Sequence, residues 1–150
     1  TTLFRSPDVC GLTDLPFDAV AAYDRRVSGL PREAFLRCWL GAPGHRALGL
    51  ARDGALAGYG VVRPCRRGSK VGPLFADDAA GAEALFDALQ SSLEPGTPLF
   101  LDTPEPNAQA VSLAEDRGMQ PVFETARMYL GPPPDATWEA VFGVTSFELG

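Results

Sequence analysis

Histidine is almost absent from this chain, and cysteine is scarce. Its 150 residues include one histidine, His45, and three cysteines that lie far apart, Cys10, Cys38 and Cys65. Without a Cys-x-x-Cys pair, neither a zinc site nor a disulfide framework is expected. Separate thiols instead indicate a reducing compartment, so we expect a cytoplasmic protein with no bound metal.

Long apolar runs and excess positive charge are lacking as well. No run approaches the roughly 18 apolar residues that a membrane span requires, and the N-terminus has no signal-peptide pattern. The chain carries 13 Lys and Arg against 19 Asp and Glu, a net charge of -6. This balance argues against nucleic acid or an anionic membrane as the main partner. The hydrophobic fraction of 45% is ordinary for one globular domain.

The clearest pattern lies in residues 69–118. Residues 71–75 and 98–101 are short apolar runs bounded by glycine and proline, which is typical of strands. Between them, apolar residues recur at steps of three and four, as on one helix face: Ala79, Ala82, Leu85, Phe86, Leu89 and Leu93. A strand–helix–strand unit favours a parallel strand pair, with ligands at the carboxyl ends of the strands.

The remaining segments predict further helices and strands. Helices are expected over residues 15–28, 31–40 and 107–118, and strands over residues 45–52, 55–63, 69–76, 121–130 and 142–149. Asp53-Gly54 predicts a hairpin turn, and Gly58 and Gly60 mark a face where something approaches the backbone closely. Residues 1–14 are either a linker or an edge strand around Leu3-Phe4. We therefore expect one α+β domain over residues 1–150, in the order ααβββαβαββ.

Several motifs resemble the GNAT superfamily of acetyl-CoA-dependent N-acetyltransferases. The stretch from Asn107 to Gly118, followed by Met119, resembles the superfamily's fourth-helix motif, in which Asn opens a helix that ends in Gly-Phe. Nearly the whole chain resembles the C-terminal domain of bacterial two-domain GNAT proteins, through residues 58–63, 70–76, 124–129 and 141–145. The resemblance implies a GNAT fold, a mixed twisted sheet of about six to seven strands with about four helices.

The resemblance also implies a function, the transfer of acetyl from acetyl-CoA to an amine of a small molecule or an amino acid. In the superfamily, pantetheine pairs with the first of two splayed parallel strands, and the pyrophosphate lies on amides that open the next helix. The corresponding cofactor-binding residues here are Gly72, Pro73, Leu74, Phe75, Ala76, Ala80, Gly81, Ala82 and Asn107. Glu124 and Asp102 are the candidate bases for the attacking amine, and Tyr129 is the candidate proton donor.

Each of these polar residues also has a purely structural explanation. Asn107 follows a proline and suits a helix N-cap. Glu124 falls on an apolar strand face, where it is either a buried carboxylate with a raised pKa or is turned outward by a β-bulge. Asp102 follows a strand end, where ordinary turn chemistry places acidic residues. Tyr129 is equally a core or rim aromatic.

Departures from the superfamily pattern leave the role of the chain open. Asp77 stands where the pyrophosphate loop has Arg or Gln, and Ala114 stands where many members have a proton-donating Tyr. A basic cluster offers another place for phosphates: Arg63, Arg66, Arg67 and Lys70. The chain is therefore a catalytic domain, a degenerate second domain that serves an N-terminal GNAT domain or a second copy, or a non-catalytic module that recognises CoA or an amino acid.

Overall fold

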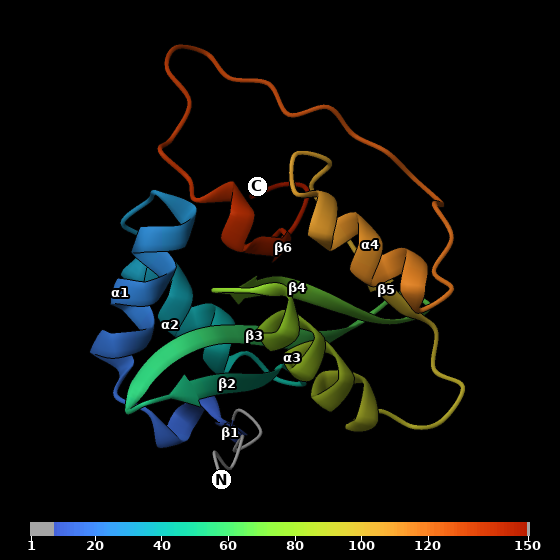
Figure 1. Cartoon of the computed structure of the whole chain (residues 1–150), viewed down its shortest axis with the longest axis horizontal. Helices are drawn as coiled ribbons and strands as arrows, with labels where there is room; N and C mark the ends of the chain where they lie inside the picture. The colour runs from blue at the N-terminus through green and yellow to red at the C-terminus, as the bar shows by residue number, and fades with distance from the viewer. Residues whose placement is uncertain (1–7, 150) are drawn as a thin grey trace, which may run out of the picture.

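A mixed sheet forms the centre of the computed structural model, which describes residues 8–149 (Figure 1). Its strands are β1 (Asp8–Gly11), β2 (Arg46–Arg52), β3 (Ala55–Cys65), β4 (Gly68–Ala76), β5 (Leu99–Leu101) and β6 (Val141–Gly143). The helices are α1 (Phe17–Ser28), α2 (Glu33–Gly41), α3 (Ala79–Ser91) and α4 (Ala108–Asp116), with short 3-10 turns η1 (Leu12–Asp14) and η2 (Trp138–Ala140). These six strands and four helices confirm the predicted α+β class.

The topology follows the predicted order over most of the chain. Strands β1 to β4 are antiparallel neighbours, and β5 joins β4 in parallel after the crossover through α3. The β2–β3 hairpin turns at Asp53 and Gly54, whose φ angles of 50° and 78° are the positive values that a tight hairpin requires. The edge strand expected around Leu3-Phe4 lies outside the described residues, and the observed edge strand begins at Asp8.

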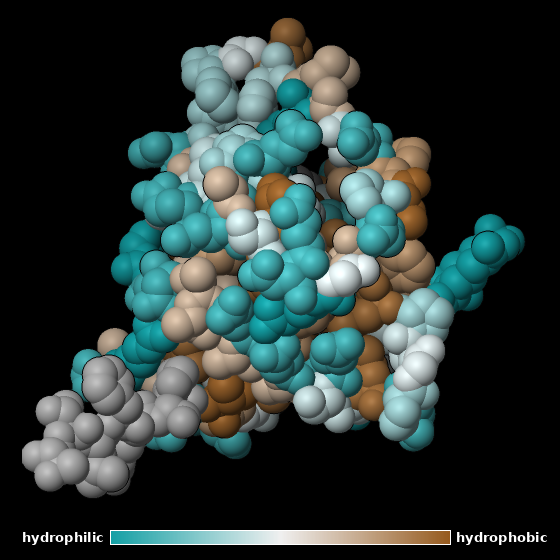
Figure 2. Space-filling model, turned by 45° about the vertical axis from the view of Figure 1, so that its right-hand side comes forward, coloured by the Kyte–Doolittle hydropathy of each residue, from teal (hydrophilic) through white to brown (hydrophobic). Residues whose placement is uncertain are grey.

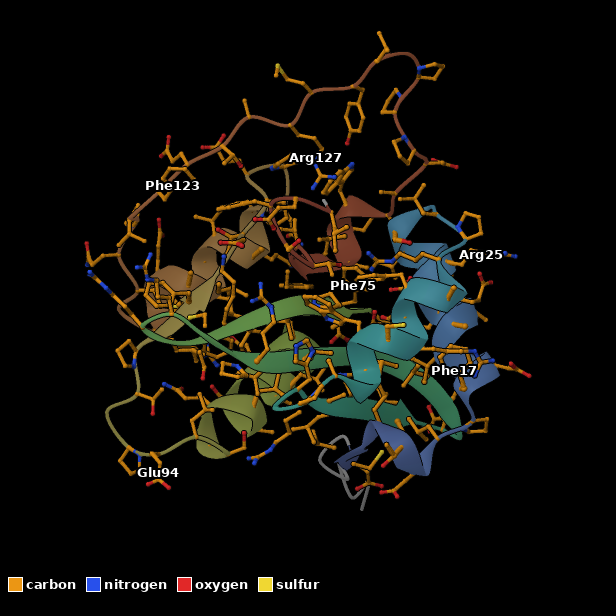
Figure 3. All side chains as sticks on the ribbon, turned by 180° about the vertical axis from the view of Figure 1, so that it is seen from behind. Phe17, Arg25, Phe75, Glu94, Phe123 and Arg127 are labelled. Atoms are coloured by element: carbon orange, nitrogen blue, oxygen red, sulfur yellow. The ribbon has the colours of Figure 1, made fainter. Side chains whose placement is uncertain are left out.

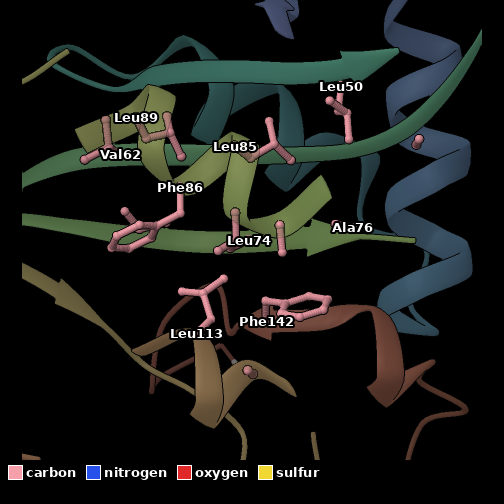
Figure 4. Close-up of a cluster of buried hydrophobic side chains, with 13 residues drawn as sticks. Leu50, Val62, Leu74, Ala76, Leu85, Phe86, Leu89, Leu113 and Phe142 are labelled. Atoms are coloured by element: carbon pink, nitrogen blue, oxygen red, sulfur yellow. The ribbon is translucent and has the colours of Figure 1, made fainter. Parts of the chain in front are cut away.

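Helices cover both faces of the sheet. Helices α1 and α2 pack on one face through a cluster that includes Val20, Leu36 and Tyr59, while α3 and α4 pack on the other (Figures 1 and 4). A Cβ on Gly58 or Gly60 would lie 3.0 Å or 2.9 Å from a leucine methyl of α3. The predicted close approach at these glycines is therefore the packing of α3 on β3.

The strand predicted over residues 121–130 is wrong. These residues belong to an extended segment without secondary structure, residues 119–137, which we call the strap. It runs from the end of α4 across the top of the molecule towards α1 (Figure 1). The alternating pattern has no sheet edge beside it here, and a strand needs a hydrogen-bonding neighbour.

The last predicted strand, residues 142–149, is confirmed only at its start. β6 covers Val141–Gly143, and residues 144–149 form bends and a turn. The Ser146 side chain and carbonyl both accept from the Leu149 amide, at 3.2 Å and 3.3 Å, which closes that turn. The chain therefore leaves the sheet after Gly143.

Candidate functional site

β6 pairs with the carboxyl-terminal half of β4, the part of the strand at which the sequence predicts that the cofactor binds. Leu74 lies opposite Gly143 and Phe75 opposite Val141 in an antiparallel register. β5 pairs with β4 only at residues 69–71, so the two parallel strands part beyond that point. The gap between splayed parallel strands, which would receive pantetheine in a GNAT protein, is filled by this chain itself.

The C-terminal segment, residues 140–146, lies tightly in this gap. A Cβ on Gly143 would lie 2.6 Å from a β5 side-chain carbon, and a Cβ on Gly72 would lie 2.5 Å from the Thr145 carbonyl oxygen. The Val144 amide donates to the Asp102 carbonyl at the end of β5, at 3.0 Å. Glycine at positions 72 and 143 therefore permits an approach that any side chain would block.

The side chains of the C-terminal segment are buried. Phe142 is 0% exposed and lies with Leu74 and Leu113 in the cluster between the sheet and helices α3 and α4 (Figure 4). Val144 is 7% exposed and belongs to the cluster on the opposite face. One short segment thus joins the two cores of the protein.

Asn107 holds the C-terminal segment as well as α4. Its Oδ1 accepts from the amides of Gln109 and Ala110, at 3.1 Å and 3.2 Å, which confirms the N-cap expected from the sequence. Its Nδ2 donates to the carbonyls of Val141 at 2.9 Å and Glu139 at 3.4 Å. Both ends of this buried amide are therefore engaged inside the chain.

The opening of α3 carries two carboxylates that are already paired. Asp78 Oδ1 accepts from the Gly81 amide at 2.8 Å, and its carboxylate pairs with Arg52 at 2.6 Å. These bonds, led by the one from Arg52, hold the pKa of Asp78 below its ordinary value. Asp77 accepts from Tyr23 at 2.9 Å and from Arg26 at 3.1 Å. A protein carboxylate thus takes the amide that an incoming pyrophosphate would use.

The small residues predicted for the pyrophosphate loop differ in their exposure to solvent. Ala82 is fully buried, whereas Ala80 is exposed. A Cβ on Gly81 would lie 2.7 Å from a methyl of Leu50, so glycine there serves the packing of α3 against β2. Helix packing therefore explains the small residues at positions 81 and 82 but does not explain Ala80.

A buried polar network lies behind β4, and sequence reasoning missed it. Asp24, 1% exposed, accepts two hydrogen bonds of 2.8 Å from Arg32 and one from Tyr59. Arg32 also donates to the Thr145 hydroxyl at 3.0 Å. Burial and the adjacent Asp24 hold the pKa of Tyr59 well above its ordinary value, so it stays a neutral donor. One signal was available, because Asp24 lies at helical spacing between apolar Val20 and Val27.

The three candidate catalytic residues lie in two different environments. Glu124 and Tyr129 are both on the strap, and Glu124 is exposed instead of lying on a buried strand face. Tyr129 lines a pocket of about 40 Å³ together with Arg127 and Trp138. Figure 3 shows Arg127 above the sheet. Asp102 directly follows β5, and its carboxylate lies 2.8 Å from the ammonium of Lys70.

The residues present do not fit acetyl-CoA in this arrangement. The β4 edge pairs with β6, and the Gly72 carbonyl accepts from the Trp39 indole N–H at 3.1 Å. Asn107, Asp102 and the Gly81 amide also have partners within the chain. Within residues 8–149, no group of three or more His, Cys, Asp or Glu side chains is placed to hold a metal ion, and none of the helices is long and apolar enough to cross a bilayer.

Several known proteins with related sequences or structures are described as acyltransferases. The chain is 27% identical over 146 residues to the holothin acyltransferase of Pseudoalteromonas sp. (strain SANK 73390), which covers 97% of this chain and 50% of that protein. A putative acetyltransferase from Pyrococcus horikoshii superposes with a TM-score of 0.74 at 25% identity, over 96% of this chain and 46% of that one. The chain thus spans about half the length of these two relatives.

The fold is shared with single-domain acetyltransferases too. The ribosomal-protein-alanine N-acetyltransferase of Brucella melitensis biovar Abortus 2308 matches with a TM-score of 0.57 at 19% identity, over 82% of this chain and 96% of that one. A family model described as an acetyltransferase (GNAT) domain matches residues 20–143. GNAT acetyltransferases use acetyl-CoA as the acetyl donor. The chain belongs to the GNAT acetyltransferase domain family.

Proposed function

We propose that this chain is the second, non-transferring domain of a two-domain N-acetyltransferase. In that protein a preceding GNAT domain transfers acetyl from acetyl-CoA to an amine of a small molecule or an amino acid. This chain shapes the acceptor site or the interface between the two domains. The observation that supports this assignment is the C-terminal segment in the gap between β4 and β5. The double length of the relatives is consistent with it.

A second candidate is acetyl transfer by this chain itself. The resemblance assigns the β4 edge, the opening of α3 and Asn107 to acetyl-CoA. Residues 140–146 engage the β4 edge and Asn107, and Asp78 engages the Gly81 amide at the opening of α3. Displacement of that segment would free the β4 edge and the Asn107 amide together. A single titration separates this candidate from the first.

The test is calorimetric titration of the folded chain with acetyl-CoA, with desulfo-CoA as the second ligand. We expect no binding up to about millimolar ligand, a concentration that corresponds to only about 4 kcal/mol of binding free energy. Ala80→Arg places a cation at the exposed start of α3 without removing a contact, and it should not create binding because β6 still fills the gap. Micromolar binding by the unaltered chain would contradict the proposal and assign the transfer to this domain.

We also expect the protein in a reducing cytoplasm. Cys10, Cys38 and Cys65 are all unpaired. Burial raises the pKa of the Cys10 thiol, and a raised pKa lowers the fraction of reactive thiolate.

A further inference from the structure

The first part of the strap, residues 121–130, has an unpaired backbone. In the part of the chain that the structure describes, no backbone hydrogen bond joins these ten positions to any other residue. All ten are exposed. An extended stretch of free N–H and C=O groups is a ready template for pairing with another strand.

The side chains of this stretch divide between two faces. Phe123 and Arg127 face the body of the molecule: the Phe123 ring lies 5.8 Å from that of Phe147, and the Arg127 guanidinium lies 4.5 Å from the centre of the Trp138 ring (Figure 3). The alternate positions carry Glu124 and Ala126 together with three apolar side chains that are almost wholly exposed, Val122 at 76%, Met128 at 86% and Leu130 at 106% of their reference areas. Figure 2 shows the strap as a ridge above the body, with hydrophobic colouring at its top.

Free backbone groups and an apolar face on the same stretch require a common partner. Exposed apolar patches on folded domains mark binding surfaces, and a sheet edge is the partner that satisfies backbone and side chains together. Natural edge strands are protected by charges and prolines. Residues 121–130 carry two charges, Glu124 and Arg127, and one proline, Pro121, which stands at the first position. Every position after Pro121 therefore has both a backbone N–H and a C=O with which to pair.

The length of the relatives points to one partner. Two relatives that match nearly the whole chain are about twice as long, so in each of them a further stretch of similar length lies in the same polypeptide. A tethered partner is present at roughly millimolar effective concentration, which favours pairing even when the contact is weak. Within the described residues, β5 of this chain has only β4 as a ladder partner. A second domain with a sheet of the same kind would offer an equally open edge for strand addition.

We propose that residues 121–130 form a β-strand on the sheet edge of the other domain of a two-domain protein. Val122, Met128 and Leu130 pack on that domain. The proposal shares with the proposed function the existence of a second domain, but it does not depend on which domain binds acetyl-CoA. Acetyl-CoA titration therefore tests the function, and the strap is tested by a separate measurement.

The measurement is amide hydrogen exchange of residues 122–130 in two samples, the isolated chain and the natural two-domain polypeptide that contains it. We expect exchange close to that of an unstructured peptide in the isolated chain, and about 100-fold slower exchange in the two-domain protein. Fast exchange in both samples would overturn the proposal. Protection in the isolated chain would overturn it too. If that protection rises with protein concentration, the partner is a second copy of the chain. If it does not, the partner is the chain's own sheet.

A matched pair of variants tests which face docks. In the two-domain protein, Met128→Asp places a charge on the apolar face. It should reduce the protection of residues 122–130 by about tenfold or more, because burying an unpaired charge costs several times RT. Thr125→Asp places the same charge on the opposite face of the same stretch and should leave protection within about threefold, as for surface substitutions in general. Equal losses in the two variants would contradict the assignment of the docking face.

Discussion

Asn107→Ala is the substitution that best separates a structural from a ligand-binding role at the centre of this site. The side chain is 5% exposed and makes hydrogen bonds at both ends. Its oxygen caps α4 through the amides of Gln109 and Ala110, and its nitrogen donates to the carbonyl of Val141 in β6. Removing it should destabilise the free chain, with no ligand present.

The expected magnitude is the sum of two effects. Loss of a side-chain N-cap costs about 1 kcal/mol. Loss of the side-chain donor to the buried Val141 carbonyl costs about 1–3 kcal/mol more, because the acceptor stays desolvated. We therefore expect Asn107→Ala to lower the free energy of unfolding by about 3 kcal/mol. Asn107→Ser keeps an oxygen for the cap and should lose only about 2 kcal/mol.

Urea unfolding followed by tryptophan fluorescence measures both variants. Trp138 lies in η2, directly before β6, and Trp39 donates to the Gly72 carbonyl of β4, so the emission of the two tryptophans reports on both sides of the C-terminal segment. A loss below about 0.5 kcal/mol in Asn107→Ala, the range of ordinary surface substitutions, would refute the assigned role of Asn107 in the free chain. Equal losses in the Ala and Ser variants would show that the cap contributes nothing measurable.

Two further substitutions extend this test. Phe142→Ala removes a fully buried ring from the C-terminal segment and should lower the free energy of unfolding by about 3–5 kcal/mol. Phe123→Ala on the strap removes a ring that is 70% exposed and should change it by less than about 0.5 kcal/mol. Similar losses in the two variants would contradict the buried position of β6. Burial lowers the pKa of His45, so the unfolded chain binds its proton more tightly and stability should decline as pH falls below about 6.5. His45→Gln should make the urea midpoint vary less with pH between about pH 5 and 7. If the midpoint varies with pH as it does in the unaltered chain, the pH dependence of stability belongs to other groups.

Local patterns were sufficient for the elements whose partners are near in sequence. The Asp53-Gly54 turn fixed the β2–β3 hairpin, and the spacing from Ala79 to Leu89 fixed α3 together with the face it buries. The pattern of residues 121–130 expresses only a capacity to form a strand. Whether that capacity is realised depends on a neighbouring strand with which to pair, and within the described residues no strand pairs with this segment.

At the candidate site, too, local features could be predicted from the sequence and long-range contacts could not. The cap formed by Asn107 followed from its place after Pro106 and before a helical stripe. The ion pair between Lys70 and Asp102 could not be predicted, because it joins neighbouring strands separated by a whole helix in sequence. The engagement of Asn107 with Val141 was equally hidden, since it depends on where the chain returns after the strap.

The energetics of the C-terminal segment explain why an internal occupant would exclude acetyl-CoA. Unseating it exposes Val141, Phe142 and Val144, all at most 7% exposed. At about 1.5–3 kcal/mol for each buried side chain, full exposure costs about 5–9 kcal/mol. A pantetheine arm would cover part of the vacated surface, so we take the net cost of unseating the segment as about 4 kcal/mol. This cost weakens acetyl-CoA binding by about three orders of magnitude. An open gap of about micromolar affinity would thus become a site of about millimolar affinity. Acetyl transfer in a two-domain protein is therefore expected on the domain whose gap between the splayed strands is open.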